Sequence, residues 1–229
     1  STHFQISLQI FRKKSWSLLD LQRIDWAPEE QLQWLRESYL TKKSMLIIGN
    51  TGSGKTSLLN ALLRESPKNE RCLIIEDTDE IQKPNNVSSK LIARIDQAGF
   101  ENIDLGELLK QSLRMRPDRI VLGEVRGSEA KNLILALSSG HTGSLTTIHA
   151  ENAAQSLLRL EILIQMGAPT WSLQTIRKLI LLGLDYIITL GSNRKNRTLH
   201  SIHKIQSLEN NGFTLTTIYQ NRLSKNKYI

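Results

Sequence analysis

The sequence predicts an α/β fold with a mainly parallel sheet flanked by helices and antiparallel strands at its C-terminal edge. Short apolar runs alternate with helix-forming segments through most of the 229 residues, as they do when helices connect parallel strands. The end of the chain differs, because residues 186–190, 198–206 and 213–219 are predicted as consecutive strands, and Asn210-Asn211-Gly212 is a hairpin turn signal. We therefore expect these strands to extend one edge of the sheet.

The N-terminal 40 residues are predicted to be distinct from the rest. Residues 4–12 alternate apolar and polar side chains, which is the period of a half-buried strand, but no partner strand follows them directly. After a short connector, residues 29–39 are predicted as a helix with acids in its first turn. We interpret residues 1–40 as the last strand of an N-terminal domain plus a linker helix, and residues 41–229 as one large domain.

Strands and helices alternate within the large domain. In chain order, we predict a strand at 45–48, a helix at 57–63, a strand at 73–77 and a mostly looped stretch at 83–102. A helix capped by Asp104 and ended by Pro117, a strand at 120–124 and a helix at 129–137 capped by Ser128 are predicted next. After these come a strand at 145–148, a helix begun by Asn152 and running to 166, and a helix at 171–182. Ligands of such sheets bind at the carboxyl ends of the strands. A glycine loop, Glu76-Asp77, Glu124 and His149 all fall at predicted strand ends, so we expect the functional site there.

The glycine loop is the strongest functional signal. Gly49-Asn50-Thr51-Gly52-Ser53-Gly54-Lys55-Thr56 fits G-x-x-x-x-G-K-[ST] and stands between a predicted strand and a predicted helix, the context of a phosphate-binding loop. A plain glycine turn would need neither the lysine nor the threonine. Lys55 is expected to reach the β- and γ-phosphates of a nucleotide, and the Thr56 hydroxyl to bind Mg²⁺. The residues predicted to contact the nucleotide are Asn50, Thr51, Gly52, Ser53, Gly54, Lys55, Thr56 and Ser57.

Carboxylates and histidines supply further candidates. Glu124 ends an apolar strand, where a carboxylate can hold Mg²⁺ through water or orient an attacking water. Four acids, Glu76, Asp77, Asp79 and Glu80, crowd the end of the neighbouring strand, and at least one of them is expected to face the metal and water. His141 and His149 bracket a turn rich in glycine and threonine, and each is as compatible with a structural role as with a catalytic one.

Four stretches, in this order, carry a family resemblance. They are Asn50-Thr51-Gly52-Ser53-Gly54-Lys55-Thr56; Ile75-Glu76-Asp77-Thr78-Asp79-Glu80; Arg114-Met115-Arg116-Pro117-Asp118-Arg119 leading into Gly123-Glu124-Val125-Arg126-Gly127; and Ser139-Gly140-His141-Thr142-Gly143-Ser144-Leu145-Thr146-Thr147-Ile148-His149-Ala150. In that order they resemble the Walker A, Asp box, Walker B and His box of the secretion ATPases, which serve type II and type IV secretion and type IV and Tad-like pili.

The resemblance implies a RecA-like P-loop NTPase domain in a hexameric ATPase that uses ATP and Mg²⁺. It implies that Glu124 is the Walker B glutamate, that Glu80 helps to activate water, and that His149 senses phosphate. Arg94, Arg114 and Arg126 lie in or near stretches from which the family supplies arginines to the phosphates or to a neighbouring site. The family also has a substantial N-terminal domain, of which only the last strand and the linker are expected here.

Charge and apolar runs bear on location and partners. The net charge is +8, and residues 193–229 hold seven Lys or Arg against the single acid Glu209. That segment is compatible with contact to an anionic membrane surface, less so to nucleic acid, or with a solvated face. The apolar run at 179–184 is too short to span a bilayer, and the single cysteine, Cys72, is predicted to be buried.

Together with these observations, the resemblance implies a cytoplasmic protein, peripheral at the inner membrane, that forms homo-hexamers and contacts inner-membrane components of its machine. Its predicted function is ATP hydrolysis that powers a secretion or pilus-assembly machine. Two alternatives stay open, a nucleic-acid translocase and a nucleotide-gated assembly module without turnover. A GTPase is disfavoured, because the sequence holds no N-K-x-D stretch to recognise guanine.

Overall fold

The computed structural model describes residues 15–94, 101–192, 197–209 and 212–221. Its centre is an eight-stranded sheet with the strand order β3-β2-β4-β5-β1-β6-β7-β8. The strands are β1 (Met45–Ile48), β2 (Cys72–Glu76), β3 (Ser89–Ile92), β4 (Arg119–Leu122), β5 (Leu145–Ile148), β6 (Tyr186–Ser192), β7 (Arg197–Glu209) and β8 (Gly212–Gln220). The strands from β3 to β6 in this order pair in parallel, whereas β7 and β8 pair antiparallel. The predicted mainly parallel sheet with an antiparallel C-terminal edge is confirmed.

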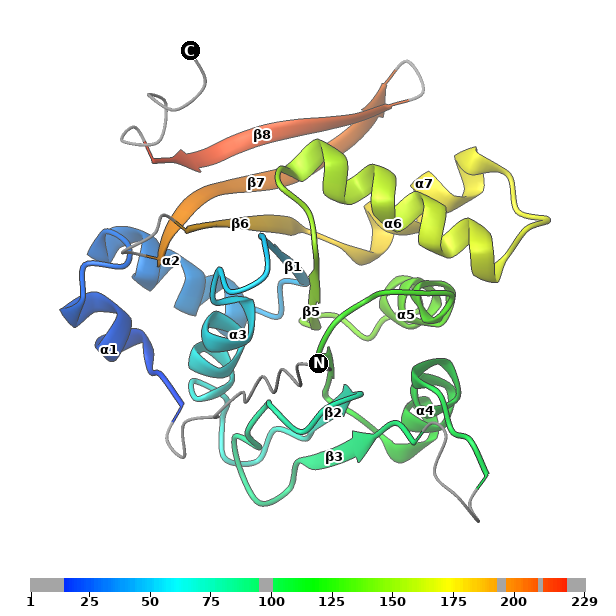
Figure 1. Ribbon diagram of the computed structural model, residues 1–229, viewed down its shortest axis with the longest axis horizontal. Helices are drawn as coiled ribbons and strands as arrows, with labels where there is room; N and C mark the ends of the chain where they lie inside the picture. Colours follow the sequence, from blue (N-terminus) through cyan, green and yellow to red (C-terminus); the bar gives the residue numbers. More distant parts are fainter. Residues whose placement is uncertain (1–14, 95–100, 193–196, 210–211, 222–229) are drawn as a thin grey trace, which may run out of the picture.

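Helices cover both faces of the sheet (Figure 1). On one face lie α1 (Leu18–Arg23), α2 (Glu29–Leu40) and α3 (Lys55–Leu63); on the other lie α4 (Leu105–Ser112), α5 (Glu129–Ser138), α6 (Ala153–Gly167) and α7 (Leu173–Gly183). A short 3₁₀ turn, Leu113–Met115, follows α4.

Strand β1 shows why the parallel strands are continuous apolar runs. Met45 and Ile47 pack into the cluster beneath α1–α3, whereas Leu46 and Ile48 pack into the cluster beneath α4–α7. Successive side chains of a strand point to opposite faces, so a strand covered on both sides buries every residue. Because β1 lies between β5 and β6, the loop that follows it emerges near the middle of the sheet.

The helix caps agree with the sequence at two positions and differ at a third. The side-chain oxygens of Asp104 and Asn152 accept hydrogen bonds from backbone amides in the first turns of α4 and α6, as predicted. The predicted cap at Ser128 is wrong, because its side chain makes no cap hydrogen bond and its backbone is helical, with φ −66° and ψ −12°. The Glu129 carboxylate accepts from the amides of Arg126 and Gly127, at 2.6 and 2.8 Å, and so ties the loop before α5 to the start of the helix. The first-turn amides of Ala130 and Lys131 bond to the carbonyls of Gly127 and Ser128 instead of to a capping side chain.

The N-terminal region bears on the predicted domain division. The predicted strand at 4–12 and the turn residues Asn210-Asn211 lie outside the described residues. Helices α1 and α2 share their apolar cluster with α3, and Trp26 O, between them, accepts a hydrogen bond from Leu199 N of β7 at 3.1 Å. The division at residue 40 stays a prediction.

A buried ion network lies at the amino ends of the strands. The Arg119 side chain is fully buried, donates to Tyr39 O at 3.0 Å and to Glu70 Oε1 at 3.2 Å, and also contacts the carbonyl of Gly143. Its guanidinium lies 3.7 Å from the centre of the Tyr39 ring. Because Arg119 opens β4 and Tyr39 belongs to α2, this network ties α2 to the sheet.

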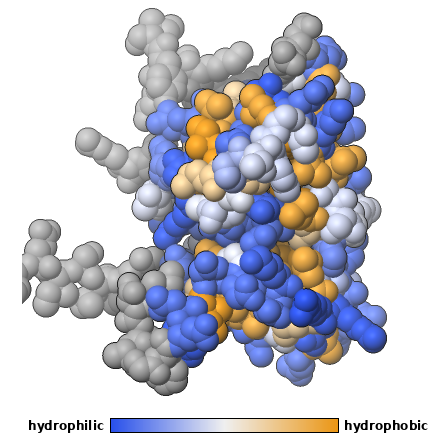
Figure 2. All heavy atoms as spheres, turned by 90° about the vertical axis from the view of Figure 1, so that its right-hand side faces the viewer, coloured by the Kyte–Doolittle hydropathy of each residue, from blue (hydrophilic) through white to orange (hydrophobic). Residues whose placement is uncertain are grey.

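The surface over α4–α7 mixes apolar and polar side chains (Figure 2). On α6, Leu158, Ile162 and Met166 are spaced four residues apart and stay 57, 54 and 63% exposed.

The predicted core position of Cys72 is confirmed, and burial raises the pKa of its thiol. None of the helices in the described ranges is long and apolar enough to cross a membrane.

Candidate functional site

The glycine loop turns sharply between β1 and α3. Gly49 has φ +152°, and a Cβ there would lie 2.5 Å from Ser53 Oγ and 2.9 Å from Leu190 O, so any side chain would clash. Gly54 has φ +98° and stands immediately before α3, where it offers no side-chain cap. The first amides of α3 have no carbonyl one turn earlier within the helix. The loop therefore presents backbone N–H groups and a helix N-terminus to one place, the usual environment of a bound phosphate.

Lys55 folds back over this loop. Its Nζ donates to Gly49 O at 2.9 Å and to Asn50 O at 3.4 Å. Burial lowers the pKa of Lys55, and the nearby Glu124 carboxylate opposes that effect. The ammonium thus stands at the loop with weak neutral acceptors that an anion can replace.

Thr56 and Asn60 join α3 to the acidic segment after β2. Thr56 Oγ1 lies 3.4 Å from Glu80 Oε2. One turn later, Asn60 Nδ2 donates to Glu80 O at 3.5 Å and Asn60 Oδ1 accepts from Gln82 N at 2.8 Å. Two successive turns of α3 therefore hold Glu80 beside the loop.

Glu76, at the end of β2, fixes the same segment through hydrogen bonds to its backbone. Its side chain is 3% exposed, and its Oε2 accepts from the amides of Glu80 and Ile81 at 3.1 and 3.0 Å. Lys90 of β3 pairs with Glu76 at 3.1 Å and also contacts Asp79. Burial raises the pKa of Glu76, although these hydrogen bonds and Lys90 favour its charged form. Glu76 therefore fixes the backbone that carries Glu80.

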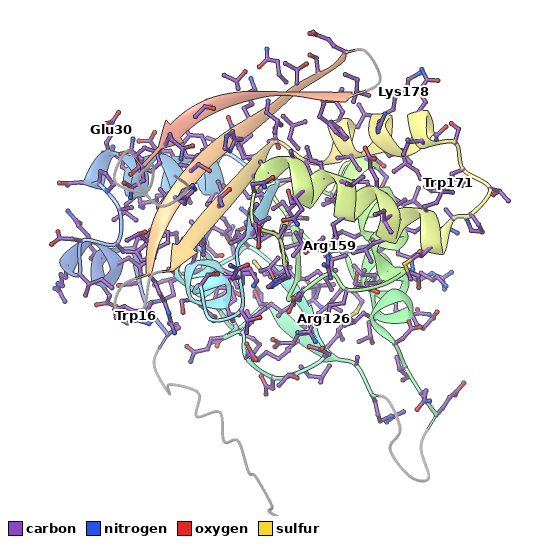
Figure 3. The ribbon with its side chains drawn as sticks, turned by 45° about the horizontal axis from the view of Figure 1, so that its top comes forward. Trp16, Glu30, Arg126, Arg159, Trp171 and Lys178 are labelled. Carbon is purple, nitrogen blue, oxygen red and sulfur yellow. The ribbon has the colours of Figure 1, made fainter. Side chains whose placement is uncertain are left out.

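Arg126 links the ends of β2 and β4. Its Nη2 donates to Glu124 Oε2 at 2.6 Å, and its Nη1 donates to Asp77 Oδ2 at 3.0 Å. The hydrogen bond with Glu124 raises the pKa of Arg126. Thr147 Oγ1 of β5 donates to Gly123 O at 2.7 Å, next to Glu124. Glu124 and Arg126 thus stand where the adjacent strands β2, β4 and β5 end, and Arg126 is labelled in Figure 3.

These groups surround one cavity of about 640 Å³. Its lining includes the predicted site residues Thr51, Gly52, Gly54, Lys55, Thr56, Ser57, Glu80, Glu124 and Arg126. Asn50 is exposed on the loop, and Ser53 is buried beneath it, with no hydrogen-bond partner for its Oγ among the described residues.

Besides Asn50 and Ser53, three predicted residues lie outside the lining of this cavity: Arg94, Arg114 and His149. Arg94 follows β3 and donates from Nε to Glu101 O at 3.2 Å, while Arg114 is exposed in the 3₁₀ turn. His149 is half-buried just after β5. Their assigned roles stay predictions. His141 has Nδ1 3.2 Å from Ala136 O, which is a structural contact.

The lining residues that sequence reasoning missed include Asn60, Thr147, Trp16 and Arg197. Asn60 had a local signal, because it stands one helical turn after Thr56 and shares its face. Trp16 and Arg197 had none, since each is brought to the cavity from a distant part of the chain.

Comparisons with known proteins agree with this geometry. A family model described as "Type II/IV secretion system protein" matches residues 2–212. The chain is 35% identical over 188 residues to the conjugal transfer protein TrbB of Rhizobium radiobacter, covering 81% of this chain and 55% of that protein. It is 38% identical over 167 residues to the type IV secretion system protein VirB11 of Bartonella quintana, covering 71% of this chain and 46% of that protein.

Solved structures show the same fold. The VirB11 ATPase of the Brucella suis type IV secretion system superposes with a TM-score of 0.70 at 28% identity, over 82% of this chain and 54% of that one. The pilus retraction motor PilT superposes with a TM-score of 0.63 at 19% identity, over 91% and 54%, which supports the RecA-like fold alone. The chain spans about half the length of the curated relatives it matches. Its family is nonetheless clear from the match over residues 2–212: this chain belongs to the type II/IV secretion system protein family.

Proposed function

We propose that this chain is the nucleotide-hydrolysing part of a ring-shaped ATPase that uses Mg²⁺ and ATP to power a bacterial secretion system or pilus-assembly machine. The observation that carries the proposal is that Lys55, Thr56, Glu80 and Glu124 line one cavity at the carboxyl ends of the strands. A phosphate-binding loop alone predicts nucleotide binding. Two carboxylates facing that loop add the groups that orient water for hydrolysis.

The donor atoms near Thr56 suit Mg²⁺. A hydroxyl oxygen and the carboxylate oxygens of Glu80 and Glu124 are the hard ligands that this ion prefers. Among the described residues no three His, Cys, Asp or Glu side chains are grouped to hold a metal by themselves. That fits an ion held by one hydroxyl, phosphate oxygens and water. Thr56 would bind it directly and Glu124 through water, and the bound ion would neutralise charge on the β- and γ-phosphates.

The protein groups then have separate tasks. Lys55 exchanges the Gly49 and Asn50 carbonyls for the β- and γ-phosphates. Glu124 and Glu80 orient the attacking water and accept its proton. Arg126 moves from Glu124 toward the γ-phosphate, which frees the carboxylate and adds positive charge where the transition state is negative.

The ring and its location extend the proposal. We place the chain in a homo-hexamer, peripheral to the cytoplasmic face of the inner membrane and in contact with membrane components of its machine. Family membership and the basic segment 193–229 support this assignment, because Lys and Arg favour contact with anionic lipid. Native mass measurement with and without ATP tests the ring, and a monomer under both conditions would contradict it for this chain.

The direct test is phosphate release from ATP with and without Mg²⁺. The wild-type chain should turn over slowly and only with Mg²⁺, and Lys55→Ala should lower turnover about a hundredfold or more. Lys43→Ala is the matched control, because Lys43 pairs with Asp185 at 3.3 Å and does not line the cavity. Wild-type turnover in Lys55→Ala would contradict the proposal.

The same assay separates the two alternatives. Stimulation by DNA that is lost at moderate salt would point to a nucleic-acid translocase. Tight ATP binding without hydrolysis by the assembled ring would point to a nucleotide-gated assembly module.

A further inference from the structure

The cavity extends beyond the phosphate loop. Asp77, Glu80 and Glu124 line it near Lys55 and Thr56, where the proposed function places the γ-phosphate and the attacking water. The nucleoside is attached to the other end of the triphosphate, so it must leave the loop away from these carboxylates. Four residues that line the cavity and carry no carboxylate are Ser15, Trp16, Ser57 and Arg197.

Trp16 is held beside α3 by its neighbours. Arg64 Nη1, just after α3, donates to Ser15 O at 2.9 Å, which fixes the backbone before the tryptophan. The Trp16 side chain packs against the apolar cluster of α1–α3 and remains half-buried, and Figure 3 shows it near the start of α1. Trp16 supplies the single aromatic ring among the described residues that line the cavity.

Arg197 forms a second wall. Its Cδ lies 3.5 Å from the position that a Cβ on Gly54 would occupy, so its side chain runs over the end of the phosphate loop. The start of β7 is held in place by Leu199 N, which donates to Trp26 O at 3.1 Å. The loop end is thus flanked by a flat aromatic ring from the N-terminal segment and a guanidinium from β7.

We propose that Trp16 and Arg197 bind the nucleoside end of the nucleotide, with the Trp16 indole stacked on the base. This inference rests on the proposed function, because it assumes that the loop holds a nucleoside triphosphate. Stacking on an aromatic ring suits any purine or pyrimidine, since every base offers a π face. The guanidinium of Arg197 contributes positive charge at the α-phosphate and ribose side.

The test compares ATP with inorganic tripolyphosphate, which has the same charged end but no nucleoside. Dissociation constants are measured by calorimetry for the wild-type chain, Trp16→Leu and Trp16→Phe. Leucine retains apolar packing against α1–α3 but removes the ring, whereas phenylalanine keeps a smaller ring. Trp171→Leu is the matched control, because Trp171 lies beyond α6 and outside the cavity lining.

We expect Trp16→Leu to weaken ATP binding about 5- to 150-fold and to leave tripolyphosphate binding unchanged. Trp16→Phe should recover part of the loss, and Trp171→Leu should bind both ligands as the wild type does. Unchanged ATP affinity in Trp16→Leu would overturn this inference and leave the proposed function intact. An equal loss for both ligands would also overturn it, since the effect would then not concern the nucleoside. A wild-type chain that binds neither ligand would overturn the proposed function and the inference together.

Discussion

Arg126 holds Glu124 in a close ion pair, with 2.6 Å between Nη2 and Oε2, and binds Asp77 with its other terminal nitrogen. The arginine thus occupies the carboxylate that is proposed to orient water. The same guanidinium lies within the cavity that holds the phosphate loop. A bound phosphate would compete with Glu124 for this guanidinium, so we expect the contacts of Arg126 to change when nucleotide binds.

Arg126→Gln should lower kcat at least about tenfold with little change in KM, because positive charge toward the transferred phosphate matters most in the transition state. Steady-state kinetics with ATP measure both constants. Arg159→Gln is the control, since Arg159 is exposed on α6 and lies outside the cavity lining. An unchanged kcat in Arg126→Gln would restrict this arginine to a structural ion pair.

Glu76→Gln tests whether Glu76 positions Glu80. The neutral amide retains the size of the side chain but accepts more weakly from the amides of Glu80 and Ile81, so kcat should fall about tenfold while ATP affinity is kept. Burial raises the pKa of Glu76, so ionisation of this carboxyl costs folding stability above that pKa, and the neutral glutamine avoids the cost. The variant should therefore unfold within about 1 kcal/mol of the wild type at pH 7. Equal losses of stability and of ATP affinity would instead indicate general disruption.

Arg119→Met should destabilise the protein by about 3 kcal/mol, because it leaves the buried Glu70 carboxylate with Lys42 as its remaining ion-pair partner. Urea unfolding measures the difference. Arg36→Met removes an exposed pair with Glu65 at 2.7 Å and should cost about 1 kcal/mol or less. Similar losses of unfolding free energy in the two variants would show that burial of the Arg119–Glu70 pair makes no difference to its contribution to stability.

His200 and His203 on β7 predict a loss of stability on acidification. Burial lowers the pKa of both, and the neighbouring His200 lowers that of His203 further. Below about pH 6.5 the unfolded chain binds protons that the folded chain does not, so the unfolding free energy falls until the lowered pKa values are reached. Melting temperatures from pH 7.5 to 5 should fall less steeply in the double variant His200→Asn, His203→Asn. Thr217→Asn on β8 should keep the wild-type slope, and an equal slope in all three proteins would refute the assignment.

Local patterns predicted most of the fold and part of the site. Strand β1, the glycine loop and α3 follow one another directly, so their apolar run, glycines and helix formers identify them together. The predicted cap of α5 was wrong because the backbone of Ser128 is already helical and the first-turn amides of the helix bond to the carbonyls of Gly127 and Ser128. Residue type alone does not predict that backbone conformation.

Long-range packing determined the features of the site that the sequence could not predict. Four acids stand at or just after the end of β2 and Lys90 of β3 contacts two of them, yet the Glu76 side chain is 3% exposed and the Asp79 side chain is 73% exposed. Trp16 and Arg197 reach the cavity from opposite ends of the chain. Neither stands in a motif, so their position follows from how α1 and β7 pack around α3.

Glu124→Gln provides the most direct test of the central claim that the phosphate loop and the facing carboxylates form a hydrolytic site. Bound ATP and released phosphate are measured in the same Mg²⁺-containing sample of wild type and variant. We predict that Glu124→Gln binds ATP with affinity near that of the wild type and releases phosphate at least about a hundredfold more slowly. Phosphate release at the wild-type rate by Glu124→Gln would contradict the account.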